Sequence, residues 1–224
     1  MNLKILNELE RVIKTSPQTL RDPLKLRQLI QATFDITIMD TSGTLAELTD
    51  KIDEAVLRKY FGEIWQPKTK QFKYSGLKIV DEINKLQPRS VLDLGCGYNE
   101  FKKTIPNLIG VDPYNKNADI QLPILDYKPE KKFDVVIVLG SINFGSTDKI
   151  FAELEHAVSL CAQGGTMFFR VNPGMKHEPP ESEWIEFYQW DANFITNCAD
   201  YFGVQMLDMR NDSNDRMYFV WRRS

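Results

Sequence analysis

The chain has 224 residues, 42% of them hydrophobic and 26% charged, and its formal net charge is −3. This length can hold one α/β domain with an appended region. No apolar stretch is long enough to span a bilayer and no signal peptide is visible, so we expect no membrane association. Three scattered cysteines suit a reducing compartment and predict a cytoplasmic protein. Only two histidines and no Cys-x-x-Cys are present, so no metal site is expected.

Helical spacing of apolar residues distinguishes the first third of the chain. It indicates three helices, around residues 3–13, 24–30 and 45–60. The alternation of Phe34, Ile36 and Ile38 permits a short strand. We therefore predict a mainly helical N-terminal extension over residues 1–73 and a separate domain over residues 74–224.

Strands and helices alternate in the second region. Seven segments have the apolar character of strands: residues 90–94, 108–112, 120–122, 133–139, 166–171, 204–209 and 217–221. Helices are expected up to residue 86, over 148–162 and over 181–201. This order predicts an α/β fold with a doubly wound, mostly parallel sheet between two helical layers, a three-layer sandwich.

Two connections between the predicted strands are short. Only residues 113–119 join the second strand to the third, and only residues 123–132 join the third to the fourth. Neither readily holds a crossover helix, so part of the sheet would be bare. We expect the N-terminal helices or a protein partner to cover it.

The most informative segment reads SVLDLGCGYNEFKKTIPNLIGVD. Its first apolar run ends in a turn containing Asp93, Gly95 and Gly97, and its second ends in Asp112, 19 residues after Asp93. In βαβ nucleotide folds, the backbone of such a glycine turn approaches the ligand, and an acid about 20 residues further on binds the ribose hydroxyls. Glu100 occupies the place of the third glycine of a dinucleotide fingerprint. Its carboxylate would face a pyrophosphate, which disfavours NAD and FAD.

At these residues the chain resembles the class I S-adenosylmethionine-dependent methyltransferases, whose first motif is an acid followed by x-Gly-x-Gly. The matching residues are Asp93, Gly95, Gly97 and, at the second strand, Asp112. Asn99 stands where many members carry a third glycine. The resemblance covers roughly residues 74–224 and implies S-adenosyl-L-methionine as cofactor. It also implies an antiparallel C-terminal strand inserted beside the fifth strand.

The resemblance implies a cofactor site at the strand ends. The predicted cofactor-binding residues are Asp93, Gly95, Gly97, Asp112, Asp126 and Gly140. Asp93 would bind the methionine amino group, Asp112 both ribose hydroxyls, and Asp126 the adenine amino group. Each residue also has an ordinary alternative. Asp93 could cap a helix, Asp112 could form a turn, Asp126 could be a plain loop residue, and Gly140 could be a simple turn.

The loops after the fourth and fifth strands should flank the methyl group, because ligands bind outside the carboxyl ends of strands. Asn143 and His177 are the predicted catalytic residues in these loops, and Asn172 is a further polar candidate. The alternative for each of these residues is that it only forms a turn of the loop. An acidic stretch over residues 172–215 would repel phosphates, and the motifs of base methylation are absent. The basic run Lys68, Lys70 and Lys73 is the one contrary sign, and its ordinary alternative is a solvated linker. On balance we expect no nucleic-acid partner.

These observations predict an enzyme that transfers a methyl group from S-adenosylmethionine to a small-molecule or protein acceptor. The alternative is a non-catalytic structural or interaction protein that retains the fold, since no catalytic motif is visible. An aromatic concentration over residues 184–190 predicts core or interdomain packing, and the alternative is a platform for the substrate. These aromatic residues and the N-terminal helices are also the candidate surfaces for a protein partner.

Overall fold

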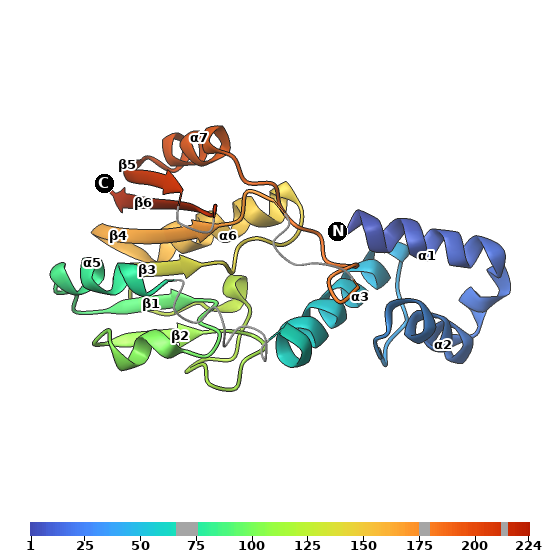
Figure 1. Ribbon diagram of the computed structural model, residues 1–224. Helices are drawn as coiled ribbons and strands as arrows, with labels where there is room; N and C mark the ends of the chain where they lie inside the picture. The colour runs from blue at the N-terminus through green and yellow to red at the C-terminus, as the bar shows by residue number, and fades with distance from the viewer. Residues whose placement is uncertain (66–75, 175–179, 212–214) are drawn as a thin grey trace. The chain divides into compact units, whose positions relative to one another are not determined.

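The chain folds into two compact units, which we describe from a computed structural model (Figure 1). The structure describes residues 1–65, 76–174, 180–211 and 215–224, without the side chain of Lys78. The first unit holds the N-terminal helices together with residues 180–186, and the rest of the described chain forms the second unit. The sequence analysis does not predict this grouping, and the predicted boundary at residue 73 lies outside the described residues. No helix of the described chain is long and apolar enough to cross a membrane.

The first unit is helical, as its apolar spacing indicates. Its elements are α1 (Leu3–Thr15), η1 (Pro17–Arg21), α2 (Pro23–Phe34), α3 (Leu45–Lys59) and the π-helical turn η2 (Tyr60–Ile64). Thr44 and Glu47 form a reciprocal capping box at the start of α3, which satisfies two backbone N–H groups at the helix end. The strand permitted at residues 34–38 does not form. Phe34 completes α2, and Asp35 then takes a left-handed backbone conformation with φ of 53°.

Residues 180–186 complete the core of the first unit. The Asn2 side chain is 1% exposed, and its Nδ2 donates a hydrogen bond of 2.8 Å to the Trp184 carbonyl. The Trp184 ring meets Phe34 edge to face, with the ring centroids 4.9 Å apart, and Ile185 is fully buried. A segment that lies far along the chain therefore belongs to the N-terminal core.

The helix predicted over residues 181–201 forms only in its second part. Helix α7 (Ala192–Phe202) begins where the Asp191 side chain accepts a hydrogen bond from the Phe194 N–H. Residues 181–191 form turns and extended chain instead. The prediction is wrong here because the apolar residues of this stretch serve two different cores, that of the first unit and that of the second.

The second unit contains a six-stranded sheet in the order β2-β1-β3-β4-β6-β5 (Figure 1). Its strands are β1 (Val91–Leu94), β2 (Leu108–Val111), β3 (Phe133–Leu139), β4 (Cys161–Val171), β5 (Val204–Asn211) and β6 (Met217–Arg223). Strand β6 runs antiparallel to both neighbours, and the other pairs are parallel. The predicted mostly parallel sheet with an antiparallel C-terminal strand is confirmed. The strand predicted at residues 120–122 is wrong, since Ile120 makes only an isolated bridge to Val111.

Alternate strand residues face two cores, as the two-residue period of a strand requires. On one face, Leu92, Val136 and Phe169 pack with α6 (Thr147–Leu160) and α7. Residues of the opposite face pack with η3 (Leu77–Ile79), α5 (Val80–Lys85) and η4 (Glu100–Lys103). The three-layer arrangement buries most of β1, β3 and β6 and leaves the carboxyl ends of β1 to β4 together at one edge of the sheet.

Candidate functional site

The structure gathers most of the predicted site residues at the carboxyl edge of the sheet. Asp93, Gly95 and Gly97 lie at or just after the end of β1, Asp112 follows β2, and Gly140 and Asn143 follow β3. Asp126 is exposed at the end of the turn η5 (Ile124–Asp126), and no hydrogen bond in the described chain joins it to the others. His177 lies outside the described residues. The candidate site is therefore formed by the carboxyl ends of β1, β2 and β3 and by the loops that follow them.

Gly95 occupies a place that has no room for a side chain. Its backbone φ is +76°, and its N–H donates to the Val111 carbonyl at 2.7 Å. A Cβ at this position would lie 2.1 Å from Cβ of Ser141, whose hydroxyl donates to the Leu94 carbonyl at 2.6 Å. The turn after β1 thus packs directly on the loop after β3, and this contact requires glycine.

Gly97 presents the opposite environment. Its φ is +51°, yet a Cβ built on it would meet no atom of the described residues within 4 Å. Its N–H donates to Oδ2 of Asp112 at 3.0 Å. The turn therefore combines one tightly packed glycine with one that borders open space, where a ligand can approach the backbone.

Asp112 organises the loop that follows β2. Its Oδ1 accepts hydrogen bonds from the N–H groups of Tyr114 and Asn115, each at 2.8 Å, and its Oδ2 accepts from Gly97. These bonds correspond to the turn-forming alternative. A carboxylate offers about four acceptor positions, so about one remains for a ligand hydroxyl.

Asp93 is a buried acid with a perturbed pKa. It is 2% exposed, and burial together with the negative charge of Asp112 raises its pKa from 3.8 to about 8. Burial raises the pKa of the Cys96 thiol, and the nearby carboxyl groups of Asp93, Asp112 and Asp119 raise it further. Cys96 is therefore a poor nucleophile, because the reactive form is the thiolate. A positive charge brought beside Asp93 would favour its ionised form.

Asn99, which stands in the sequence where many members of the resembling family carry a third glycine, has a structural role that the sequence analysis did not predict. It adopts a left-handed conformation with φ of 56°, and its Nδ2 donates to the Asn117 carbonyl at 3.1 Å and to Asp119 Oδ2 at 3.2 Å. Gly110 makes room for it, since a Cβ there would lie 2.5 Å from Asn99 Oδ1. Asn99 thus ties the glycine turn to the loop after β2. The sequence did contain an indication of the left-handed conformation, because Asn is among the non-glycine residues that best tolerate this backbone region.

Two substitutions separate the backbone role of Asn99 from its side-chain role. Asn99→Gly keeps the left-handed conformation and loses the two hydrogen bonds, which should lower the free energy of unfolding by about 1–2 kcal/mol. Asn99→Ala should cost roughly 1 kcal/mol more, because alanine is strained in this conformation. Urea denaturation of both variants measures the difference. Equal stability of the two variants would contradict the backbone assignment.

Asn143 joins the loops after β3 and β4. It is 1% exposed, its Oδ1 accepts a hydrogen bond from the Asn172 N–H, and its carbonyl accepts from the Tyr188 N–H, both at 2.9 Å. The Trp190 indole N–H donates to the Ile142 carbonyl at 3.1 Å. Within the described part of the chain, Nδ2 of Asn143 and Oδ1 of Asn172 are buried and have no hydrogen-bond partner. Asn143 therefore holds the loops after β3 and β4 together through its Oδ1 and its carbonyl group.

Known proteins share this fold at low sequence identity. No protein-family model and no curated protein sequence matches the chain. A 1,6-didemethyltoxoflavin-N1-methyltransferase from Burkholderia thailandensis, solved with S-adenosylhomocysteine, is 14% identical with a TM-score of 0.61, and the match covers 84% of this chain and 95% of that one. The magnesium protoporphyrin IX methyltransferase of Synechocystis, with bound S-adenosylhomocysteine, is 14% identical with a TM-score of 0.59 over 77% of this chain and 100% of that one.

A third solved structure extends the pattern. An S-adenosylmethionine-dependent methyltransferase from Clostridium acetobutylicum is 12% identical with a TM-score of 0.52, covering 70% of this chain and 98% of that one. The chain therefore has the fold of the class I S-adenosylmethionine-dependent methyltransferases, and the resemblance predicted from the segment between β1 and β2 is confirmed at the level of the fold.

Proposed function

We propose that the protein transfers a methyl group from S-adenosyl-L-methionine to a small-molecule or protein acceptor. The observation that carries this proposal is the glycine turn after β1. It is hydrogen bonded to the Asp112 carboxylate at the end of β2 and packed against Ser141 after β3. Three structural neighbours with this fold are methyltransferases, and two of them were solved with S-adenosylhomocysteine. The non-catalytic alternative is not favoured by these neighbours.

The residues at the carboxyl edge fit such a cofactor. The open space beside Gly97 admits a ligand to the backbone, and Asp112 keeps an acceptor position for a ribose hydroxyl. Asp93 would face the methionine ammonium, whose positive charge offsets the repulsion from Asp112. Asp126 and Gly140 stay predicted contacts. When bound, S-adenosylmethionine supplies a methyl group on a positively charged sulfur.

The protein's own contribution to the reaction is positioning. Fixing acceptor and methyl donor in line supplies much of the rate of such a displacement. The loops after β3 and β4 are joined through Asn143 and form the proposed acceptor side, and Asn143 stays a predicted catalytic residue that acts by holding these loops together. His177 stays a predicted catalytic residue.

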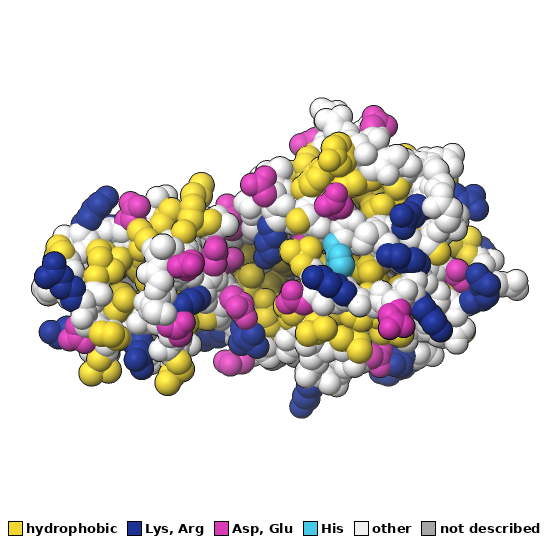
Figure 2. Space-filling model, turned by 180° about the vertical axis from the view of Figure 1, so that it is seen from behind, with side chains coloured by type: hydrophobic (Ala, Val, Ile, Leu, Met, Phe, Trp, Pro, Cys, Tyr) yellow, Lys and Arg dark blue, Asp and Glu magenta, His cyan; other side chains and the backbone are white. Residues whose placement is uncertain are grey.

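Charge distribution supports a small-molecule or protein acceptor. The described side chains on the face shown in Figure 2 mix basic and acidic groups, and the acidic stretch over residues 172–215 would repel a phosphate backbone. A methyl-incorporation assay with small molecules, protein extract and nucleic acid tests this choice. Incorporation confined to nucleic acid would contradict the proposed acceptor class.

Binding of S-adenosylhomocysteine is the direct test of the cofactor. Calorimetry should show binding by the wild type, with NAD as a negative control. Asp112→Asn should weaken binding by about 1–3 kcal/mol, because a ligand hydroxyl loses its charged acceptor. Asp81→Asn, at an exposed acid of α5, serves as the matched control and should leave affinity unchanged. A wild type that binds neither S-adenosylmethionine nor its demethylated product would refute the proposed function.

A further inference from the structure

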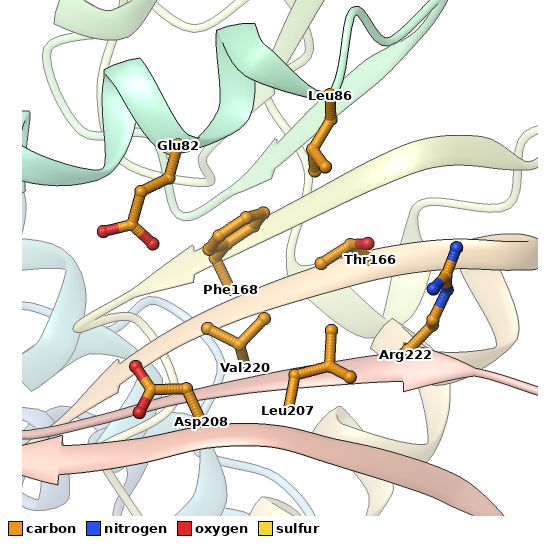
Figure 3. A pocket seen from close by; sticks show the side chains of 8 residues that line it. All are labelled: Glu82, Leu86, Thr166, Phe168, Leu207, Asp208, Val220 and Arg222. Carbon is orange, nitrogen blue, oxygen red and sulfur yellow. The ribbon is translucent and has the colours of Figure 1, made fainter.

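The two faces of the sheet are covered unequally. Helices α6 and α7, with 14 and 11 residues, pack on one face, whereas the described helix α5 on the other face has six. Beside α5, over β4, β6 and β5, the second unit has an open groove with a volume of about 280 Å³ (Figure 3). Sheet faces in α/β folds are normally covered, so this groove is a candidate contact surface.

A β-bulge in β5 shapes the groove. Met206 lies opposite Trp221 on β6, but Asp208 lies opposite Val220, so Leu207 is an extra residue in the strand. As a result both Leu207 and Asp208 line the groove (Figure 3). A bulge of this kind re-aims side chains that regular alternation would place on opposite faces.

Exposed leucines border a buried apolar floor. Phe168 and Val220 form the floor and are 3% and 5% exposed. Leu86 of the α5 side and Leu207 of β5 are 50% and 47% exposed. The groove therefore presents two large apolar side chains that a partner could remove from water.

The two ends of the groove carry opposite charge. Glu82 and Asp208 lie toward one end, where both form ion pairs with Arg210, so the two carboxylates and one guanidinium described in this cluster sum to one negative charge. Arg222 lies at the other end and is exposed (Figure 3). A two-fold axis through the middle of the groove would place Arg222 of each copy against the acidic end of the other.

We propose that this groove binds a second copy of the chain in a two-fold symmetric dimer. Leu86 and Leu207 of the two copies form the apolar centre, and the charged ends pair reciprocally. The groove is small for an obligate interface, which buries about 800 Å² or more per partner. The expected association is therefore reversible, with a dissociation constant in roughly the micromolar range.

Sedimentation analysis of the full chain between low and high micromolar concentrations tests the proposal. The wild type should change from monomer to dimer, and added salt should weaken the dimer. Leu207→Asp and Arg222→Glu should each raise the dissociation constant at least tenfold. Leu24→Asp, at a leucine that is 62% exposed in the first unit, is the matched control and should have no effect.

A charge exchange makes the test independent of folding defects. Asp208→Lys alone and Arg222→Glu alone should each impair association, while the double variant restores it, because the two ends again carry opposite charge. A wild type that stays monomeric at all concentrations would overturn the proposal and leave the groove to another protein or a small ligand. A dimer whose dissociation constant is unchanged by all of these substitutions would also overturn the proposal. Neither result bears on binding of S-adenosylhomocysteine, so this proposal and the proposed function fail separately.

Discussion

The free energy of unfolding should contain a pH-dependent contribution from Asp93 that disappears in Asp93→Asn. The folded protein holds this carboxyl with a pKa of about 8, whereas the ordinary value is 3.8. Between these pH values the folded state retains a proton that the unfolded chain has released. The Asp93 contribution to stability is therefore fully present below about pH 4 and is lost as the pH rises through 8. The slope is at most about 1.4 kcal/mol per pH unit.

Urea denaturation from pH 5 to pH 9 measures this contribution as the difference between wild type and Asp93→Asn. The variant should gain stability relative to the wild type as the pH increases. Asp81→Asn, at an exposed acid of α5, is the control and should follow the wild-type curve. Parallel curves for wild type and Asp93→Asn would contradict the buried, protonated state. Saturating S-adenosylmethionine should flatten the wild-type slope, because its ammonium group favours the ionised carboxylate.

Gly95→Ala should be among the most damaging single-methyl additions in this protein. The left-handed backbone costs about 1–2 kcal/mol for alanine, and the new Cβ would lie 2.1 Å from Cβ of Ser141. That atom is one bond from the backbone and cannot rotate away, so overpacking adds about 1–3 kcal/mol. We expect a total loss of roughly 2–5 kcal/mol in the free energy of unfolding.

Two further variants separate strain from collision. Gly164 has φ of +74° and nothing within 4 Å of an added Cβ, so Gly164→Ala reports the backbone cost alone. Adding Ser141→Gly to Gly95→Ala should restore the stability lost through the collision, while the loss caused by backbone strain remains. If Gly95→Ala and Gly164→Ala prove equally destabilised in urea denaturation, the close packing between the β1 and β3 ends is not significant for stability.

The sequence predicted the buried strands well and the connections poorly. Phe133–Leu139 is apolar except for Asp134 near its start, and the structure forms a strand over the same residues. Ile120 has no such run around it, and its single bridge to Val111 depends on loop contacts that a local pattern does not contain. Trp184 and Trp190 lie six positions apart yet pack in different units, so one continuous helical pattern could not describe both.

The candidate site was predictable where it depends on glycine spacing. The structure brings Gly95 and Gly97 beside Asp112, as the motif predicts, and the binding roles of these residues stay predictions. The hydrogen bonds of Asn99 could not be predicted, because its partners follow β2 and become neighbours only in the folded sheet. The same holds for the pairing of Asn143 with Asn172 across two loops.

The inclusion of residues 180–186 in the first unit has a consequence for synthesis on the ribosome. Helices α1 to α3 emerge first, but their core needs Trp184 and Ile185, which are made roughly 120 residues later. At about 5–20 residues per second, this delay is on the order of ten seconds. During that interval the N-terminal helices expose the apolar surface that these two residues cover in the finished chain. The part of the protein that is translated first thus completes its core late, and nascent chains of intermediate length should be the species most dependent on chaperones.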